Sequence, residues 1–135
     1  MTLPGSANAA VHAFVHAINR QSPAELYALM TEDHVFIDSL GNRVAGRDKV
    51  RAGWEGYFGM VPDYTVAIEE TFVEGPLVLL FGTAQGTYSK DGALRPENGW
   101  STPAAWRAVV SDGLIAEWRV YADNEPIRQV MARNR

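Results

Sequence analysis

The chain has 135 residues, of which 47% are hydrophobic and 21% are charged, and its net charge is −4 at pH 7. These values are typical of a globular protein and exclude disordered, collagen-like and coiled-coil chains. The acidic balance argues against nucleic acid as a partner, because duplex binding normally needs a basic face. The absence of cysteine excludes disulfides, thiolate metal sites and a cysteine nucleophile. We expect one domain over residues 1–135, since this length leaves no room for two ordinary cores.

Neither a leader nor a membrane span is expected. The N-terminal segment has no basic stretch ahead of an apolar run, and histidines interrupt its apolar residues. The most apolar run, residues 76–84, is far shorter than the roughly 20 residues that a spanning helix needs. We therefore expect a cytoplasmic protein with no membrane contact.

Two helices are predicted at the start of the chain. Apolar residues recur at helical spacing over residues 11–18, which indicates one buried stripe. Ser22 and Pro23 then form a helix start, with Glu25 completing a capping box. The buried face of this second helix is expected to comprise Leu26, Leu29 and Met30.

Strands dominate the rest of the chain. Residues 34–38 predict a first strand, a turn follows at residues 41–42, and residues 46–61 predict a third helix. Four later strands and a short closing helix follow. The strands are expected over residues 64–73, 77–88, 101–110 and 114–122. Helices gathered early and strands late predict an α+β fold, in which a curved antiparallel sheet wraps around helices to form a cone with an internal pocket.

Several short motifs occur in an order that is typical of one known family. They are Thr31-Glu32-Asp33, Gly46-Arg47-Asp48, Pro62-Asp63-Tyr64, Gly82-Thr83 with Gly86-Thr87, and Ser111-Asp112-Gly113 with Tyr121 and Asp123. In this order the chain resembles, over nearly its whole length, the SnoaL-like branch of the nuclear transport factor 2-like superfamily. The resemblance implies a cystatin-like α+β cone. It does not imply one activity, because the superfamily includes isomerases, cyclases, dehydratases, hydrolases and plain binders.

Asp38 is the first candidate catalytic residue. It ends the predicted first strand among apolar residues, so burial is expected to raise its pKa and make it a proton-shuttling base. The resemblance to ketosteroid isomerases implies the same role, because their general base lies in a matching Asp-x-x-Gly stretch. The alternative is that Asp38 caps the turn that follows it.

Other catalytic groups of related families are missing at the matching positions. Phe14 stands where ketosteroid isomerases have a tyrosine donor, and Ala105 or Trp106 stands where they have an aspartic acid. Efficient steroid isomerisation is therefore not expected. Limonene-epoxide-hydrolase-like chemistry is nearly excluded, because its charged residues are replaced by Gly82, Ala84 and Val120.

Asp123 is the second candidate, since SnoaL-type cyclases have an acid–base aspartate near the end of the last strand. Capping of the closing helix, by Asp123 or Asn124, is the simpler role. His12 and His16 have a spacing that can hold a metal, but no third ligand is apparent, so no metal site is expected. His34, at the start of a strand beside Asp33, is expected to be exposed.

Aromatic residues from separate elements are expected to surround the pocket and bind a flat apolar ligand. These candidate substrate-binding residues are Phe14, Phe36, Trp54, Phe58, Trp106 and Trp118. The small residues Gly82, Ala84 and Gly86 would leave space opposite them, and Tyr57 and Tyr88 are candidate hydroxyl donors. Alternatively, the rings simply fill the cone as core.

The sequence contains no phosphate loop, dinucleotide fingerprint, nucleophile elbow or zinc signature. We therefore expect a cofactor-independent isomerase, cyclase or lyase acting on a small apolar carbonyl compound. The alternative is a non-catalytic binder of small hydrophobic ligands or a structural dimerisation module. A homodimer is expected, because relatives commonly pair through the later strands, which here carry many apolar residues.

Overall fold

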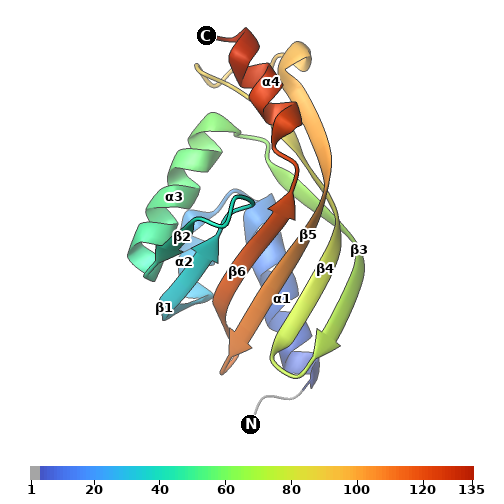
Figure 1. Cartoon of the computed structure of the whole chain (residues 1–135). Coiled ribbons are helices and arrows are strands. Elements are labelled where there is room, and N and C mark those ends of the chain that lie inside the picture. The colour runs from blue at the N-terminus through green and yellow to red at the C-terminus, as the bar shows by residue number, and fades with distance from the viewer. Residues whose placement is uncertain (1–3) are drawn as a thin grey trace.

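The computed structural model describes residues 4–135, which form four helices and a strongly curved six-stranded sheet (Figure 1). The first three residues, part of the segment expected not to be a leader, lie outside this range. The helices are α1 (Pro4–Asn19), α2 (Pro23–Ala28), α3 (Arg47–Met60) and α4 (Glu125–Arg133). The strands are β1 (Met30–Ile37), β2 (Arg43–Ala45), β3 (Thr65–Glu74), β4 (Leu77–Thr87), β5 (Gly99–Ser111) and β6 (Leu114–Ala122), with a 3₁₀ turn, η1 (Pro96–Asn98), before β5.

The strands are ordered β2-β1-β6-β5-β4-β3. Neighbours pair antiparallel except β1 and β6, which run parallel, with Phe36 opposite Trp118. The predicted α+β cone is confirmed. The sheet has one parallel pair because β1 comes before the β3–β6 meander in the chain and pairs with the free edge of β6, the last strand of that meander. Helix α1 packs on the inner face of the sheet, α3 lies beside the β1–β2 edge, and α4 lies beyond the ends of the long strands (Figure 1).

The start of β1 differs from the prediction. Ser22 caps α2 as expected, its hydroxyl accepting the Glu25 N–H at 3.2 Å. However, α2 ends at Ala28, and Met30 opens β1 as a fully buried strand residue rather than lying on a helix face. The short strand β2 was also not predicted, because its three residues are all exposed and have no buried period.

Two glycines of β4 bring backbones together instead of opening a pocket. A Cβ built on Gly82 would lie 1.8 Å from the Ala67 carbonyl oxygen, and one on Gly86 would lie 2.4 Å from Val61 Cγ1. The expectation that both leave space for a ligand is therefore wrong. The space is occupied by β3 and by the residue that follows α3, so these positions serve packing.

His34 is fully buried, and the expectation of exposure is wrong. Its Nδ1 lies 2.6 Å from the Ile115 carbonyl oxygen, and its ring stacks on Phe14 with centroids 6.1 Å apart. Because a carbonyl only accepts, Nδ1 carries the hydrogen. Burial lowers the pKa of His34, although the bond to Ile115 and the charges of Glu117 and Asp33 act against this. The imidazole is thus a neutral member of the core.

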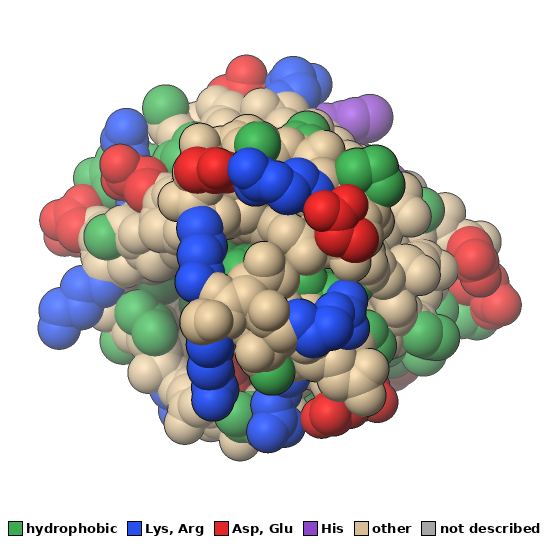
Figure 2. All heavy atoms as spheres, turned by 90° about the horizontal axis from the view of Figure 1, so that it is seen from above, with side chains coloured by type: hydrophobic (Ala, Val, Ile, Leu, Met, Phe, Trp, Pro, Cys, Tyr) green, Lys and Arg blue, Asp and Glu red, His purple; other side chains and the backbone are tan. Residues whose placement is uncertain are grey.

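The surface at the α4 end carries acidic and basic side chains next to one another, with hydrophobic side chains between them (Figure 2). No helix within residues 4–135 is long and apolar enough to cross a bilayer.

Candidate functional site

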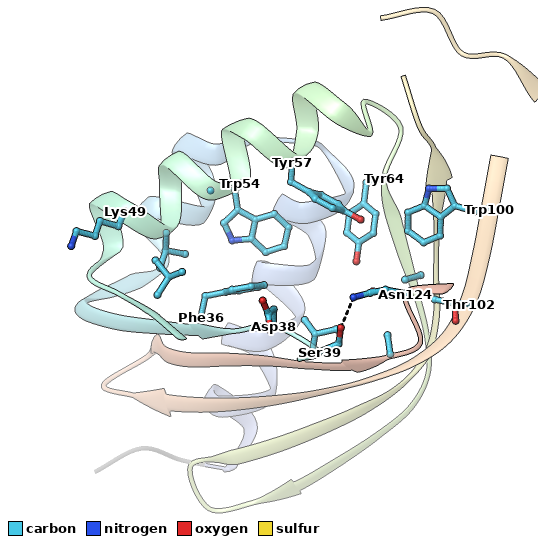
Figure 3. A pocket seen from close by; sticks show the side chains of 16 residues that line it. Phe36, Asp38, Ser39, Lys49, Trp54, Tyr57, Tyr64, Trp100, Thr102 and Asn124 are labelled. Atoms are coloured by element: carbon cyan, nitrogen blue, oxygen red, sulfur yellow. Dashed lines mark hydrogen bonds between the residues drawn. The ribbon is translucent and has the colours of Figure 1, made fainter. Parts of the chain in front are cut away.

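A cavity of about 270 Å³ lies between α3 and the inner side of the sheet (Figure 3). Helix α3 contributes one wall through Val50, Gly53, Trp54 and Tyr57. The opposite wall comes from β1, β4 and β6, with Phe36, Ala84, Val120 and Ala122. The walls are mostly apolar, which suits an apolar ligand oriented by a few polar groups.

Asp38 lines this cavity immediately after β1. Its Oδ1 accepts the backbone N–H groups of Leu40 and Asn42, each at 2.9 Å, and its Oδ2 accepts the Asn42 side-chain amide at 3.1 Å. The turn between β1 and β2 therefore holds the carboxylate in place. Asp38 caps the turn, as the alternative interpretation expected, and its side chain also lies on the cavity wall.

The expected rise in the pKa of Asp38 is wrong. Burial does act to raise the pKa, but the hydrogen bonds from Asn42, Leu40 and Gly41 together outweigh burial and lower it. The residue is only partly buried, so the turn amides and not the apolar walls dominate its environment. Asp38 is consequently ionised at neutral pH and is able to accept a proton.

Of the six aromatic candidates, Phe36 and Trp54 lie on the cavity wall. Their rings meet edge to face with centroids 5.8 Å apart, which joins β1 to α3. The indole N–H of Trp54 is buried and has no hydrogen-bond partner among residues 4–135.

The other four aromatic candidates lie in the hydrophobic core and not on the cavity wall. They are Phe14, Phe58, Trp106 and Trp118. Phe14 packs on Trp118 with centroids 4.9 Å apart, and Trp118 stacks on Trp106 at 6.5 Å. These rings fill the deep part of the cone, as the alternative interpretation expected, and leave the cavity at its open end.

Asp123 is exposed and does not line the cavity. Its Oδ1 accepts the Glu125 N–H at 2.9 Å, immediately before α4 begins. The N-cap residue of α4 is Asn124, whose side chain makes no capping hydrogen bond, so Asp123 supports the turn before the helix and neither residue caps it as predicted. Neighbouring Asn124 does line the cavity, and its side-chain amide donates to the Ser39 hydroxyl at 2.6 Å, tying the start of α4 to the end of β1 (Figure 3).

The lining residues that sequence reasoning missed include Lys49, Tyr64, Trp100 and Asn124. Tyr64, Trp100 and Asn124 lie at or next to the ends of elements, where periodicity does not define a face, and Lys49 lies in the first turn of α3. The Pro62-Asp63-Tyr64 motif was a usable signal for Tyr64. Asp63 accepts from Thr87 through both carboxylate oxygens, at 2.7 and 2.8 Å, and so fixes the chain beside Tyr64.

Two tyrosines point into the cavity from its α3 side. Tyr57 and Tyr64 lie edge to face with ring centroids 5.0 Å apart, and the Tyr64 ring points down towards Asn124 (Figure 3). Burial raises the pKa of both phenols, so each keeps its hydrogen throughout the physiological range. Tyr88, the other predicted donor, does not line the cavity.

The cavity thus joins an ionised carboxylate to neutral phenols across apolar walls, which suits proton transfer next to a carbonyl. Ala84 and Val120 contribute apolar surface to the cavity wall. On α1, His12 is half-buried and His16 exposed, and the described residues contain no group of three or more side chains placed to hold a metal.

A family model for the SnoaL-like domain matches residues 11–118. Similar solved structures include an M. tuberculosis LEH-like epoxide hydrolase, at 22% identity and a TM-score of 0.79 over 96% of this chain and 92% of that one. A Shewanella denitrificans structure assigned as a SnoaL-like polyketide cyclase has 16% identity and a TM-score of 0.80, with coverage of 94% and 97%. A hypothetical protein with a ketosteroid isomerase-like fold from Catenulispora acidiphila, in complex with trimethylamine, has 18% identity and a TM-score of 0.76, with coverage of 87% and 88%. At these identities the structures establish the fold alone. No curated protein sequence shows significant similarity to the chain.

Proposed function

Because the chain belongs to the SnoaL-like domain family, we propose that it is a cofactor-independent acid–base enzyme, an isomerase, cyclase or lyase, acting on a small apolar carbonyl compound. The observation that carries the proposal is the position of Asp38, an ionised carboxylate on the wall of a mostly apolar cavity. Phe36 and Trp54 supply flat apolar surface on which a planar substrate packs.

Asp38 acts as the base in this mechanism. Its carboxylate takes a proton from the carbon next to the substrate carbonyl, the C–H electron pair moves into an enolate, and the protonated Asp38 returns the proton to carbon. The turn amides keep Asp38 anionic, but they also make it a weak base. The substrate must therefore have a C–H group that is already acidic, such as one between a carbonyl and an aromatic ring.

Hydrogen–deuterium exchange tests this proposal without knowledge of the natural substrate. The probe is 2-tetralone, a two-ring ketone with acidic C–H groups beside its carbonyl. We expect the protein to accelerate exchange of these hydrogens in D₂O, followed by NMR, and Asp38→Asn to reduce the acceleration by about 10²-fold or more. Asn keeps an acceptor for the turn amides, and Asp112→Asn, in the exposed β5–β6 turn, is the matched control.

The second candidate function is a non-catalytic binder of small hydrophobic ligands. The observation that favours it is the lowered pKa of Asp38, whose oxygens already accept three hydrogen bonds. Binding of 2-tetralone without accelerated exchange would support this candidate over the enzyme. Absence of 2-tetralone binding would support neither candidate and would favour a structural dimerisation role.

We also propose that two copies of the chain pair through the outer face of the sheet. Phe81, Ala105 and Tyr121 form one row across β4, β5 and β6. Phe81 and Tyr121 are 41% and 48% exposed, and Phe72, which packs edge to face on Phe81, is 54% exposed. Large exposed apolar side chains that are contiguous support a self-complementary contact with a second copy.

A further inference from the structure

Tyr57 and Tyr64 are two polar residues of the cavity wall that the proposed proton transfer does not use. Tyr64 is only 7% exposed, and neither phenol has a hydrogen-bond partner among residues 4–135, although both line the cavity. Neither hydroxyl oxygen is among the fully buried, unpartnered polar atoms of the described residues, so both are open to the cavity. Each phenol is therefore free to donate to a molecule that occupies the cavity.

The two phenols are positioned to act together. Their rings meet nearly perpendicular, at 89°, and they are held by different elements, Tyr57 by α3 and Tyr64 by the turn between α3 and β3. Tyr64 is further fixed by its backbone N–H, which donates to the Val61 carbonyl at 3.1 Å, and by its ring contact with Trp100 at 6.1 Å between centroids. Both rings come from the wall opposite Phe36, Asp38 and Ser39 (Figure 3).

We propose that Tyr57 and Tyr64 form the donor site for the acceptor oxygen of the ligand, and that the ligand is a compact ketone of one or two rings. Both phenols are neutral donors at neutral pH, which suits a carbonyl that becomes an enolate. These donors replace the groups that are missing at Phe14, Ala105 and Trp106, and they lie in a different part of the cone. The proposal rests on the proposed function in taking this cavity as the ligand site and a carbonyl compound as the ligand.

The size of the cavity sets the size of the ligand. Pockets for drug-sized ligands have volumes of roughly 300–1,000 Å³, and this cavity, at about 270 Å³, lies just below that range. The core rings Trp106 and Trp118 fill the deeper part of the cone. A ligand with one or two fused rings matches this volume, and the filled core leaves no deeper space for a larger ring system.

The donor site is tested with a matched pair of probes. One is 2-tetralone labelled with ¹³C at the carbonyl, and the other is tetralin, the hydrocarbon of the same shape without oxygen. Affinity is measured by calorimetry, and hydrogen bonding to the carbonyl is measured by infrared spectroscopy, because a donor lowers the C=O stretching frequency. The variants are Tyr64→Phe, Tyr57→Phe and the double variant, with Tyr121→Phe on the outer sheet face as the control.

We expect each single variant to weaken 2-tetralone binding by about 3- to 10-fold and to leave tetralin binding unchanged. The C=O frequency should rise in each variant and most in the double variant, and Tyr121→Phe should change nothing. Equal losses for both probes, an unchanged C=O frequency, or no binding of 2-tetralone by the unmodified protein would overturn the inference. A protein that binds the ketone through the tyrosines but does not accelerate its exchange would refute the proposed enzyme and leave the donor site standing.

Discussion

Asn42 holds Asp38 through both carboxylate oxygens, with its backbone N–H on Oδ1 at 2.9 Å and its side-chain amide on Oδ2 at 3.1 Å. This contact fixes a carboxylate at the edge of an apolar cavity and sets its basicity. Without this contact, the Asp38 side chain would face water at the end of β1. The turn between β1 and β2 therefore both holds the Asp38 carboxylate in place and sets its basicity in the proposed chemistry.

Removal of the Asn42 side chain should raise the pKa of Asp38. In Asn42→Ala, Oδ2 loses a donor while the backbone bonds remain, so the pKa moves up towards the ordinary value of 3.8. NMR titration of the Asp38 carboxyl carbon measures this shift. Leu40→Ala, which removes only an exposed side chain, is the control and should leave the pKa where it is. An unchanged pKa in Asn42→Ala would show that the side-chain amide does not stabilise the carboxylate.

His34 should make folding sensitive to mild acid. Its pKa in the folded state is lowered from 6.5 by burial, so the unfolded chain binds more protons below about pH 6.5. The free energy of unfolding should therefore fall as the pH drops below 6.5. Protonation would also place a hydrogen on Nε2, which is buried and has no partner within residues 4–135.

Urea denaturation at several pH values tests this expectation. In His34→Asn, an amide N–H can replace Nδ1–H, and the dependence on pH between 6.5 and 5 should weaken. His16→Gln, at an exposed position on α1, should retain it. Equal pH dependence in His34→Asn and in the unmodified protein would contradict the assignment.

Replacement of Gly82 and of Gly56 by alanine should change the free energy of unfolding in opposite directions. Gly82→Ala places a Cβ against the Ala67 carbonyl and should destabilise the fold by about 2 kcal/mol or more. Gly56 lies inside α3 with open space around the position of a Cβ, so Gly56→Ala should stabilise by about 0.5–1 kcal/mol. Urea unfolding of both variants measures the difference. Destabilisation by Gly56→Ala would mean that this stretch of α3 needs the freedom of glycine.

The outer sheet face should hold two copies together. We expect sedimentation velocity to give a dimer for the unmodified chain and a monomer for Phe81→Asp, because a charge there would be buried without a partner. Leu94→Asp, at an exposed position in the loop before η1, is the matched control and should remain dimeric. A dimer that persists in Phe81→Asp would place the interface elsewhere.

Periodicity was informative where side chains alternate regularly. Phe36 and Asp38 were expected on one face, and both line the cavity. The late strands, which carry strong β propensity, lie within two residues of their predicted limits. The sequence carried no such periodic signal for the short, exposed strand β2 or for the change from helix to strand at Met30. Neither segment has a repeated pattern of buried residues.

The cavity itself was harder to predict than its fold. Inward-facing Trp106 and Trp118 were expected to hold a ligand, yet they stack on each other in the core, where Trp118 also packs on Phe14. Alternation along a strand indicates that a side chain faces inward. It does not show at which level of the cone the packed core ends and the cavity begins. Tyr64 and Asn124 lie next to element ends, so only the folded chain brings them to the cavity.

The pKa of Asp38 with and without bound 2-tetralone tests the central claim most directly. In the free protein, NMR titration should place the pKa of the Asp38 carboxyl below its ordinary value, because the turn amides stabilise the anion. A ketone packed against the carboxylate displaces water, so binding should raise that pKa. The same pKa in both states, at ketone concentrations that saturate binding, would place the ligand away from Asp38 and contradict its role as the base.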